Sequence, residues 1–305
     1  MKIFNWPIKK DAKILALGPE SAGNFSFYQQ GKIQYFSGFG DLLITKNFLK
    51  FKGGVNNFIK ANKPDIILTD LHPQYNPSQF GEFLAQKLKI PVHKIQHHQA
   101  HFFSGIGDEM IGGEKEPTAA LGIVCDGTGY GLDGKIWGGE VFLWQNKKIE
   151  RVGCLEEQTL LGADLAIQEP ARMLLAILLK GCHCEKGAVG RPTKQSRGQY
   201  CHCEDDERSE ENEAIPRLNN GIASSVSALP RPPRNDSIIQ PLIKKYFTCQ
   251  KFNVLVKQYQ EKFNALETTS AGRILDAVSL LLGFCQNQRN FKHEPVYLLE
   301  KNSTT

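Results

Sequence analysis

The chain begins a strand-rich pattern twice, and this repetition most constrains its fold. An apolar run at 13–18 ends in a glycine and precedes the alternating residues 24–36, which predict a β-hairpin. A second apolar run at 120–125 predicts a buried strand that ends in a glycine-rich loop, and another strand pattern covers 138–144. The repetition favours two related lobes that face each other across a cleft.

Helical periodicity fills the stretches between these strands. The spacing of apolar residues predicts strands at 65–70 and 92–95 and helices over 47–61, 78–88, 170–180, 238–263 and 269–284. Helices that alternate with short apolar strands are typical of an α/β fold with a mixed sheet.

The composition indicates an ordinary globular protein. The 305 residues are 41% hydrophobic and 23% charged, and the net charge of +5 gives no reason to expect a nucleic acid or a membrane as partner. No apolar run is long enough to span a bilayer, and residues 1–13 lack the apolar core of a signal peptide. We therefore expect a cytoplasmic protein whose eight cysteines are reduced thiols or metal ligands.

A change of character beyond residue 180 predicts an insertion. Residues 181–235 contain Cys-His-Cys-Glu twice, an acidic run and several prolines, and they lose apolar periodicity. We interpret them as a disordered, repeat-like insertion that resembles a translated repetitive DNA element. A structural zinc site is the alternative for Cys182, Cys184, Cys201 and Cys203, although Cys-x-Cys is tighter than the usual spacing. The expected organisation is a first lobe at 1–118, the start of a second lobe at 119–180, the insertion, and a helical continuation at 236–305.

A histidine cluster at a predicted strand-to-helix junction is the strongest candidate for chemistry. His97 and His101 lie four positions apart, so on a helix they share a face and can bind one divalent metal ion. Asp126 ends the later apolar run and could be a third, hard ligand. The alternatives are satisfied core or surface histidines and an aspartate that caps its own turn.

Two further segments could contact a nucleotide. Glycines after Asp126 would let the backbone approach a phosphate, although such turns are often only structural. Ser270 is a candidate helix cap, and Asp276 could accept hydrogen bonds from a ribose or belong to a solvated helix face.

Taken together, the motifs resemble one family. The segments are Gln-His-His-Gln-Ala-His at 96–101, Asp-Gly-Thr-Gly-Tyr-Gly-Leu-Asp-Gly-Lys-Ile-Trp-Gly-Gly-Glu at 126–140 and Ser-Ala-Gly-Arg-Ile-Leu-Asp-Ala at 270–277. They resemble the C-terminal domain of the hydrogenase-maturation carbamoyltransferases (the HypF family), which is similar to the tRNA threonylcarbamoyl-adenosine synthase (TsaD) family. The resemblance implies a two-lobed actin-like or Hsp70-like ATPase fold of the ribonuclease H type, with the second lobe incomplete and interrupted by the low-complexity insertion.

The resemblance also implies a site and a reaction. It implies a zinc or iron ion held by His97 and His101 with Asp126 as third ligand, and a carbamoyl-adenylate (or ATP) with its phosphate near Gly127, Thr128 and Gly129 and its ribose near Asp276. The carbamoyl group would pass to the C-terminal cysteine of a partner protein in nickel–iron hydrogenase maturation. A separate adenylate-forming domain or fragment would have to supply the carbamoyl-adenylate.

Two alternatives to an active carbamoyltransferase stay open. The family's aromatic-Glu-Gly-Gln stretch is replaced by 291–294 (Phe-Lys-His-Glu), and the chain ends at Thr305 before the family's late glycine-rich nucleotide loop, which together fit an inactive, truncated remnant. A metallohydrolase could use the same histidines, but Gln99 does not supply the carboxylate base of a His-Glu-x-x-His motif.

Overall fold

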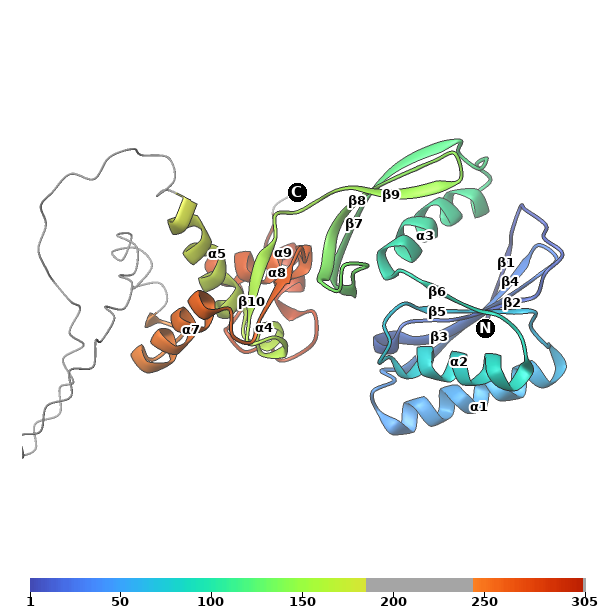
Figure 1. The fold of residues 1–305 in the computed structure, drawn as a ribbon, viewed down its shortest axis with the longest axis horizontal. Helices are drawn as coiled ribbons and strands as arrows, with labels where there is room; N and C mark the ends of the chain where they lie inside the picture. Colours follow the sequence, from blue (N-terminus) through green and yellow to red (C-terminus); the bar gives the residue numbers. More distant parts are fainter. Residues whose placement is uncertain (185–243, 304–305) are drawn as a thin grey trace, which may run out of the picture.

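The computed structural model describes residues 1–184 and 244–303 and divides their strands between two sheets (Figure 1). The first sheet has the order β1-β4-β3-β2-β5-β6 and comprises β1 (Lys2–Asn5), β2 (Ile14–Leu17), β3 (Gly23–Gln29), β4 (Lys32–Gly40), β5 (Ile66–Asp70) and β6 (Val92–Ile95). The second has the order β10-β11-β8-β7, with β9 paired to β8, and comprises β7 (Ala119–Tyr130), β8 (Ile136–Gln145), β9 (Lys148–Cys154), β10 (Gln158–Leu161) and β11 (Ala265–Thr268). The predicted α/β class with a mixed sheet is confirmed.

The first sheet is mixed because an antiparallel meander and a parallel unit share β2. β3 and β4 form the predicted hairpin, whose two-residue turn holds Gln30 and Gly31 at φ values of 48° and 79°, as a type I′ turn requires. On its other edge β2 pairs in parallel with β5, which pairs in parallel with β6. Helix α1 (Thr45–Ala61) leads from β4 into β5, and α2 (Asn76–Leu88) crosses from β5 to β6.

Aromatic side chains form the core between the first sheet and these two helices. The expected apolar side of α1 is confirmed, since Phe51 and Val55 are fully buried and Phe48 and Phe58 pack beside them. The ring of Phe25 in β3 contacts the ring of Phe58 at a centroid distance of 5.7 Å. Figure 1 shows α1 and α2 on the same side of this sheet, so their buried residues share one core.

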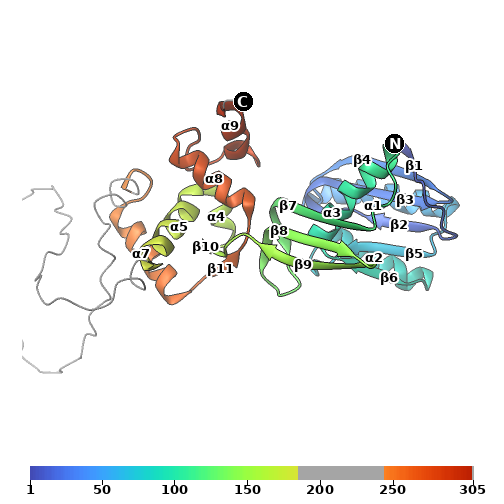
Figure 2. The same ribbon diagram turned by 90° about the horizontal axis from the view of Figure 1, so that it is seen from above.

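Helix α3 (His97–Ile111) connects the two sheets in space. It follows β6 directly and lies between the first sheet and the β7-β8-β9 meander (Figures 1 and 2). Phe102 of α3 packs on Phe142 of β8 and covers Gly122 of β7, where an added Cβ would come within 2.5 Å of the Phe102 ring. On the first sheet, Asp70 is the register partner of Ile95, so the end of β5 lies beside the start of α3.

Strand β7 corrects two predictions. The predicted glycine-rich loop after residue 125 is wrong, because β7 continues to Tyr130 and a shift of register between Cys125 and Gly129 marks a β-bulge. The predicted burial of strand 120–125 is also wrong, because Leu121 and Ile123 are 69% and 75% exposed. In the described part of the chain, β7 is an edge strand whose alternate side chains only are directed to α3.

A second core lies between the remaining strands and helices. The helices are α4 (Asp164–Gln168), α5 (Pro170–Cys184), α7 (Cys249–Glu261), α8 (Ala271–Leu281) and α9 (Glu294–Asn302), with a short 3-10 helix, η1 (Glu20–Ala22), in the first half of the chain. Leu175 of α5 and Leu280 of α8 are fully buried in this core. The core places the first turn of α8 directly against β7 and β8, which matters for the site.

Helix caps explain where two predicted helices begin. The Thr248 side chain accepts a hydrogen bond from the backbone N–H of Lys251, so α7 begins at Cys249 and 244–248 are not helical as predicted. The predicted cap at Ser270 is confirmed, since its hydroxyl accepts from the N–H of Arg273. α8 is shorter than the predicted 269–284 and is followed by Gly283 at a φ of 77°.

The predicted insertion lies almost wholly outside the described residues. Helix α5 continues through Cys184, past its predicted end at 180. The remainder of 181–235, with Cys201 and Cys203 of the alternative zinc site, is not described, nor are the side chains of Cys182 and Cys184. None of the helices in 1–184 and 244–303 combines the length and apolar character that a membrane crossing needs.

Candidate metal centre

The candidate site begins at the first turn of α3, where the chain changes from strand to helix. Gln96 has an extended backbone, and its side-chain Oε1 caps the helix by accepting a hydrogen bond of 2.9 Å from the N–H of Gln99. One turn of helix then separates His97 from His101, whose Nε2 atoms lie 3.2 Å apart. The predicted junction and shared helix face are therefore present.

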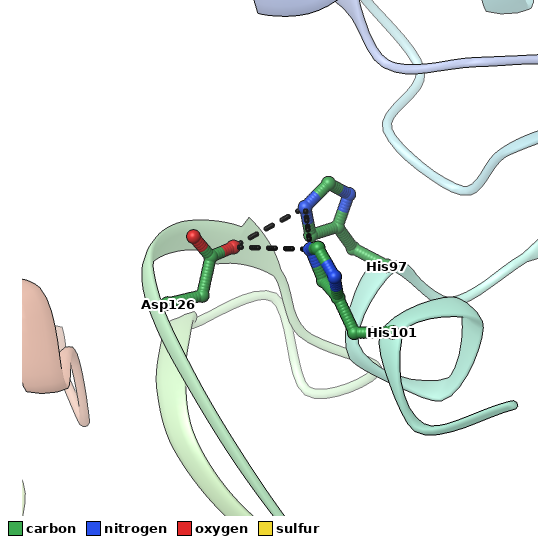
Figure 3. A group of neighbouring side chains, drawn as sticks. All are labelled: His97, His101 and Asp126. Atoms are coloured by element: carbon green, nitrogen blue, oxygen red, sulfur yellow. Dashed lines mark hydrogen bonds and ion pairs between the residues drawn. The ribbon is translucent and has the colours of Figure 1, made fainter. Parts of the chain in front are cut away.

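Asp126 approaches the two imidazoles from the second sheet (Figure 3). Its Oδ2 lies 3.2 Å from the Nε2 of His97 and 3.9 Å from the Nε2 of His101. The β-bulge that contains Asp126 directs the side chain toward α3. The structure thus brings together all three predicted ligands, with one donor atom from each within 4.8 Å of the others.

The spacing of these atoms fits a divalent ion. Ligand atoms about 2.1 Å from a tetrahedral ion are roughly 3.4 Å apart, close to the three separations found here. Two imidazole nitrogens and one carboxylate oxygen are a donor set used for zinc and for non-haem iron. The Oδ1 of Asp126 accepts a 2.6 Å hydrogen bond from the N–H of Gly127. The turn-capping role and the orientation toward the histidines therefore coexist in one side chain.

Asp70 is a site residue that the sequence analysis missed. Its Oδ2 lies 2.7 Å from the Nδ1 of His97, on the opposite side of the ring from Asp126. A carboxylate in this position fixes the ring orientation and leaves Nε2 available to a metal ion. A signal was present, because Asp70 ends a predicted strand and the next predicted strand, 92–95, precedes the histidines.

The carboxylates give the centre a strong preference for positive charge. Burial lowers the pKa of His97, but hydrogen bonds to Asp126 and Asp70 outweigh it and raise that pKa to about 9. Burial, followed by the charge of His97, lowers the pKa of His101. Burial opposes ionisation of Asp126, but the hydrogen bond to His97 prevails and its pKa is lowered. The metal-free chain therefore holds a proton where the centre can hold a cation.

The glycines after Asp126 provide space for packing. A Cβ on Gly129 would lie 2.4 Å from the His98 ring, and a Cβ on Gly272 of α8 would lie 2.9 Å from the Cα of Gly127. Neither Gly127 nor Gly129 has a positive φ. Gly127 donates its N–H to Asp126, so of the predicted phosphate contacts this amide is already engaged. Thr128 lies within the bulge between them.

Asp276 lies one step away from the glycines, behind an arginine. Its Oδ2 pairs with Arg273 at 2.7 Å and with Arg289 at 2.8 Å, while its Oδ1 is buried without a hydrogen-bond partner. The Nη2 of Arg273 extends toward Gly127, where an added Cβ would lie 3.2 Å from it. Asp276 is only 2% exposed, so the alternative of a solvated helix face is wrong for this residue. The buried cation Arg273 was not predicted.

The fold and the centre define a class of protein. Two strand meanders start two sheets, and a two-histidine, one-aspartate cluster lies where the helix after the first sheet meets the first strand of the second. The family model described as "HypF Kae1-like domain" matches residues 9–108. That described as "Carbamoyltransferase, Kae1-like Domain, second subdomain" matches 122–230 and 226–305.

The chain belongs to the family of HypF-type, Kae1-like carbamoyltransferase domains. It is 33% identical over 296 residues to the Methanocaldococcus jannaschii protein named "Probable carbamoyltransferase HypF", and 27% identical to "Carbamoyltransferase HypF" of Synechocystis sp.. Each comparison covers 96% of this chain but only 31% and 32% of the relative, so the chain spans about a third of their length.

Solved structures agree with this assignment. The crystal structure of HypF from T. kodakarensis has a TM-score of 0.70 at 25% identity and covers 98% of this chain and 33% of that one. The structure of full-length HypF in a phosphate- and nucleotide-bound form has a TM-score of 0.71 at 22% identity and covers 98% and 31%. The second likeness supports the fold alone, and both agree with the predicted two-lobed architecture.

Proposed function

We propose that this chain transfers a carbamoyl group from carbamoyl-adenylate to the C-terminal cysteine of a partner protein during nickel–iron hydrogenase maturation. The observation that carries the proposal is the convergence of His97, His101 and Asp126 in a chain of the HypF carbamoyltransferase family. A zinc or iron ion bound by these three residues would supply Lewis-acid polarisation of a carbonyl oxygen. Asp70 fixes the orientation of His97 for that role.

The residues around the first turn of α8 support nucleotide binding. Arg273 is 93% buried by its 7% exposure and has an Nε without a hydrogen-bond partner, so it can neutralise a phosphate near Gly127 and Gly129. The N-terminal turn of α8 adds a favourable dipole for an anion. The unpaired Oδ1 of Asp276 can accept a hydrogen bond from a ribose hydroxyl. A solved relative is described as phosphate- and nucleotide-bound, which agrees with this proposal.

The proposed reaction exchanges one bond to the carbamoyl carbon for another. The cysteine thiolate of the partner attacks that carbon, a carbon–sulfur bond forms, and the bond to the phosphate oxygen breaks. AMP leaves with the electron pair, and the product is a thiocarbamate on the partner. The carbamoyl-adenylate would come from a separate adenylate-forming domain or fragment.

Metal content tests the centre before any activity assay. We expect near-stoichiometric zinc or iron in the purified wild-type chain and its loss in the double variant His97→Ala/His101→Ala, measured by elemental mass spectrometry with thermal melting of the same samples. His93→Ala is the matched control, because this histidine is exposed on β6. Metal that is absent from the wild type, or unchanged in the double variant, would contradict the metal centre.

Transfer itself is tested with carbamoyl-adenylate and a peptide that ends in cysteine. Mass spectrometry should detect a thiocarbamate on the peptide when wild-type chain is present, and much less with Asp126→Asn. The adenylate-forming fragment of a HypF relative can generate the donor in the same tube. A metal-loaded chain that never modifies the peptide, even with that fragment supplied, would favour the inactive remnant.

A further inference from the structure

The side chain of Gln96 has its amide orientation fixed by two backbone groups. Its Oε1 accepts from the N–H of Gln99, which can only donate, and its Nε2 lies 3.0 Å from the carbonyl oxygen of Tyr130, which can only accept. Exchanging the two amide atoms would break both hydrogen bonds. Since Gln96 is 3% exposed, no solvent would replace them.

This orientation determines the tautomer of His98. The Nε2 of Gln96 also lies 3.1 Å from the Nδ1 of His98 and is a donor, so that Nδ1 accepts and carries no proton. The proton of the imidazole is then on Nε2. His98 is 0% exposed, and the Gln96 contact is therefore what decides between the two ring nitrogens.

The Nε2–H of His98 is directed toward the metal centre. It lies 3.8 Å from the Oδ2 of Asp126, and both atoms are buried without a hydrogen-bond partner. At this distance no hydrogen bond is formed, but a movement of about 1 Å would form one. Gly129 makes the arrangement possible, because a Cβ there would lie 2.4 Å from the Cε1 of His98.

We propose that His98 is a positioning residue that holds the Asp126 carboxylate for metal binding, and that Gln96 keeps its N–H directed at that carboxylate. The inference rests on the proposed metal centre and adds to it a pair of residues that bind no ion themselves. The Nε2–H restrains the oxygen that faces His97 and His101, as outer partners of metal ligands commonly do. Asp126 is thereby held from both ends, since Gly127 binds its Oδ1.

The tautomer can be measured directly in the full chain without metal. Long-range nitrogen–proton spectra of protein labelled with 15N-histidine, with His98 assigned by its loss in His98→Leu, should show a protonated Nε2 and a bare Nδ1. A proton on Nδ1 would overturn the proposal. This measurement requires no metal and no carbamoyl chemistry, so its failure is distinct from failure of the proposed function.

Zinc affinity, measured by competition with a chromophoric chelator, tests the consequence. His98→Leu fills the space without a donor and should weaken zinc binding about 10- to 100-fold. His98→Gln can still present an N–H and should restore most of that loss. An affinity of His98→Leu equal to that of the wild type, or equal losses in both variants, would overturn the positioning role.

Gln96→Glu provides a second test that leaves His98 in place. Glutamate can still cap Gln99, but it can only accept from His98, so the imidazole proton should move to Nδ1. The bare Nε2 would then repel Asp126, and zinc binding should weaken as in His98→Leu. A shifted tautomer with unchanged zinc affinity would overturn the proposal.

Discussion

The two oxygens of Asp126 have separate tasks. Oδ1 closes a hydrogen bond to the backbone of Gly127, while Oδ2 faces His97 and His101. Sequence reasoning treated turn capping and metal binding as alternatives, because a one-dimensional pattern does not separate the two atoms of one carboxylate. The bulge in β7 makes both contacts possible at once.

Asp126→Asn should separate the two tasks. The amide oxygen can still accept from Gly127, so the melting temperature should change little, while loss of the negative charge should weaken zinc binding at least about 100-fold. Chelator competition and thermal melting measure the two effects. Asp108→Asn, an exposed substitution on α3, is the control. A large fall in the melting temperature with unchanged zinc affinity would assign Asp126 to structure alone.

Glu140 is a buried residue whose importance lies in folding. Its fully buried carboxylate accepts from the N–H groups of Gly138 and Gly139, from the Thr269 hydroxyl and from Arg151 at 2.5 Å. Burial raises its pKa, but these hydrogen bonds outweigh burial and lower it below its ordinary value. Glu140 thereby fixes β8 to β9 and to the segment before α8.

Glu140→Gln should lower the free energy of unfolding by about 2–4 kcal/mol at neutral pH, because Arg151 loses its charged partner. A depressed carboxyl pKa contributes stability above the unfolded-state value, and this contribution is lost as the pH falls through the folded-state value. Urea unfolding between pH 7 and pH 3 should therefore show a steeper acid loss in the wild type than in the variant. Parallel pH profiles would contradict this account.

At the scale of elements, close packing of α8 on the second sheet explains the glycines better than ligand approach does. An added Cβ on Gly138 of β8 would lie 2.8 Å from the Cα of Ser270, the residue that caps α8. The same helix places Arg273 beside Gly127 and Asp276 behind it. The glycine-rich motif is therefore an imprint of this helix on the sheet.

Gly272→Ala should destabilise the protein by about 1–3 kcal/mol, because its Cβ would be 2.9 Å from the Cα of Gly127. Gly53→Ala in α1 is the matched control, since a Cβ there meets nothing within 4 Å and alanine favours the helix by about 0.5–1 kcal/mol. Urea unfolding of both variants should give changes of opposite sign. A stabilising Gly272→Ala would show that α8 does not pack this closely.

Local patterns predicted the elements whose interactions are local. The hairpin β3-β4, helices α1 to α3 and the cap of α8 follow from periodicity and turn or cap residues. Strands β10 and β11 escaped prediction because each has four residues and their partners are distant in sequence, as with Thr268 and Ile136. The bulge in β7 escaped because it depends on α8, some 140 positions later. For the site, the three candidate ligands were predictable, whereas Arg273 and the tautomer of His98 depend on tertiary contacts.

At the scale of the whole molecule, the two meanders differ at one edge. Strand β2 pairs with β3 on one side and with β5 on the other, whereas β7 pairs with β8 and its second edge is free of strands in the described residues. A groove of ≈ 750 Å³ borders this edge and is lined by His101 and Phe102 of α3 together with Leu121 to Cys125. Leu121 and Ile123 are largely exposed beside it. An apolar edge strand of this kind promotes association.

Leu121→Lys should therefore reduce self-association of the chain in sedimentation experiments without lowering its melting temperature. Leu43→Lys is a close control, because both leucines are 69% exposed and Leu43 lies away from β7. Equal effects of the two substitutions would show that general surface charge, and not the β7 edge, governs solubility.

The placement of the candidate ligands has a mechanical consequence. Two of them lie on the helix that follows the first sheet and the third on the first strand of the second sheet, so a shared ion would act as a removable staple between the two sheets. A metal clip that closes a long stretch of chain restricts its fluctuations. The metal supply would then set the stiffness of the molecule as well as its reactivity, and chelation would loosen the junction at which the partner's cysteine must arrive.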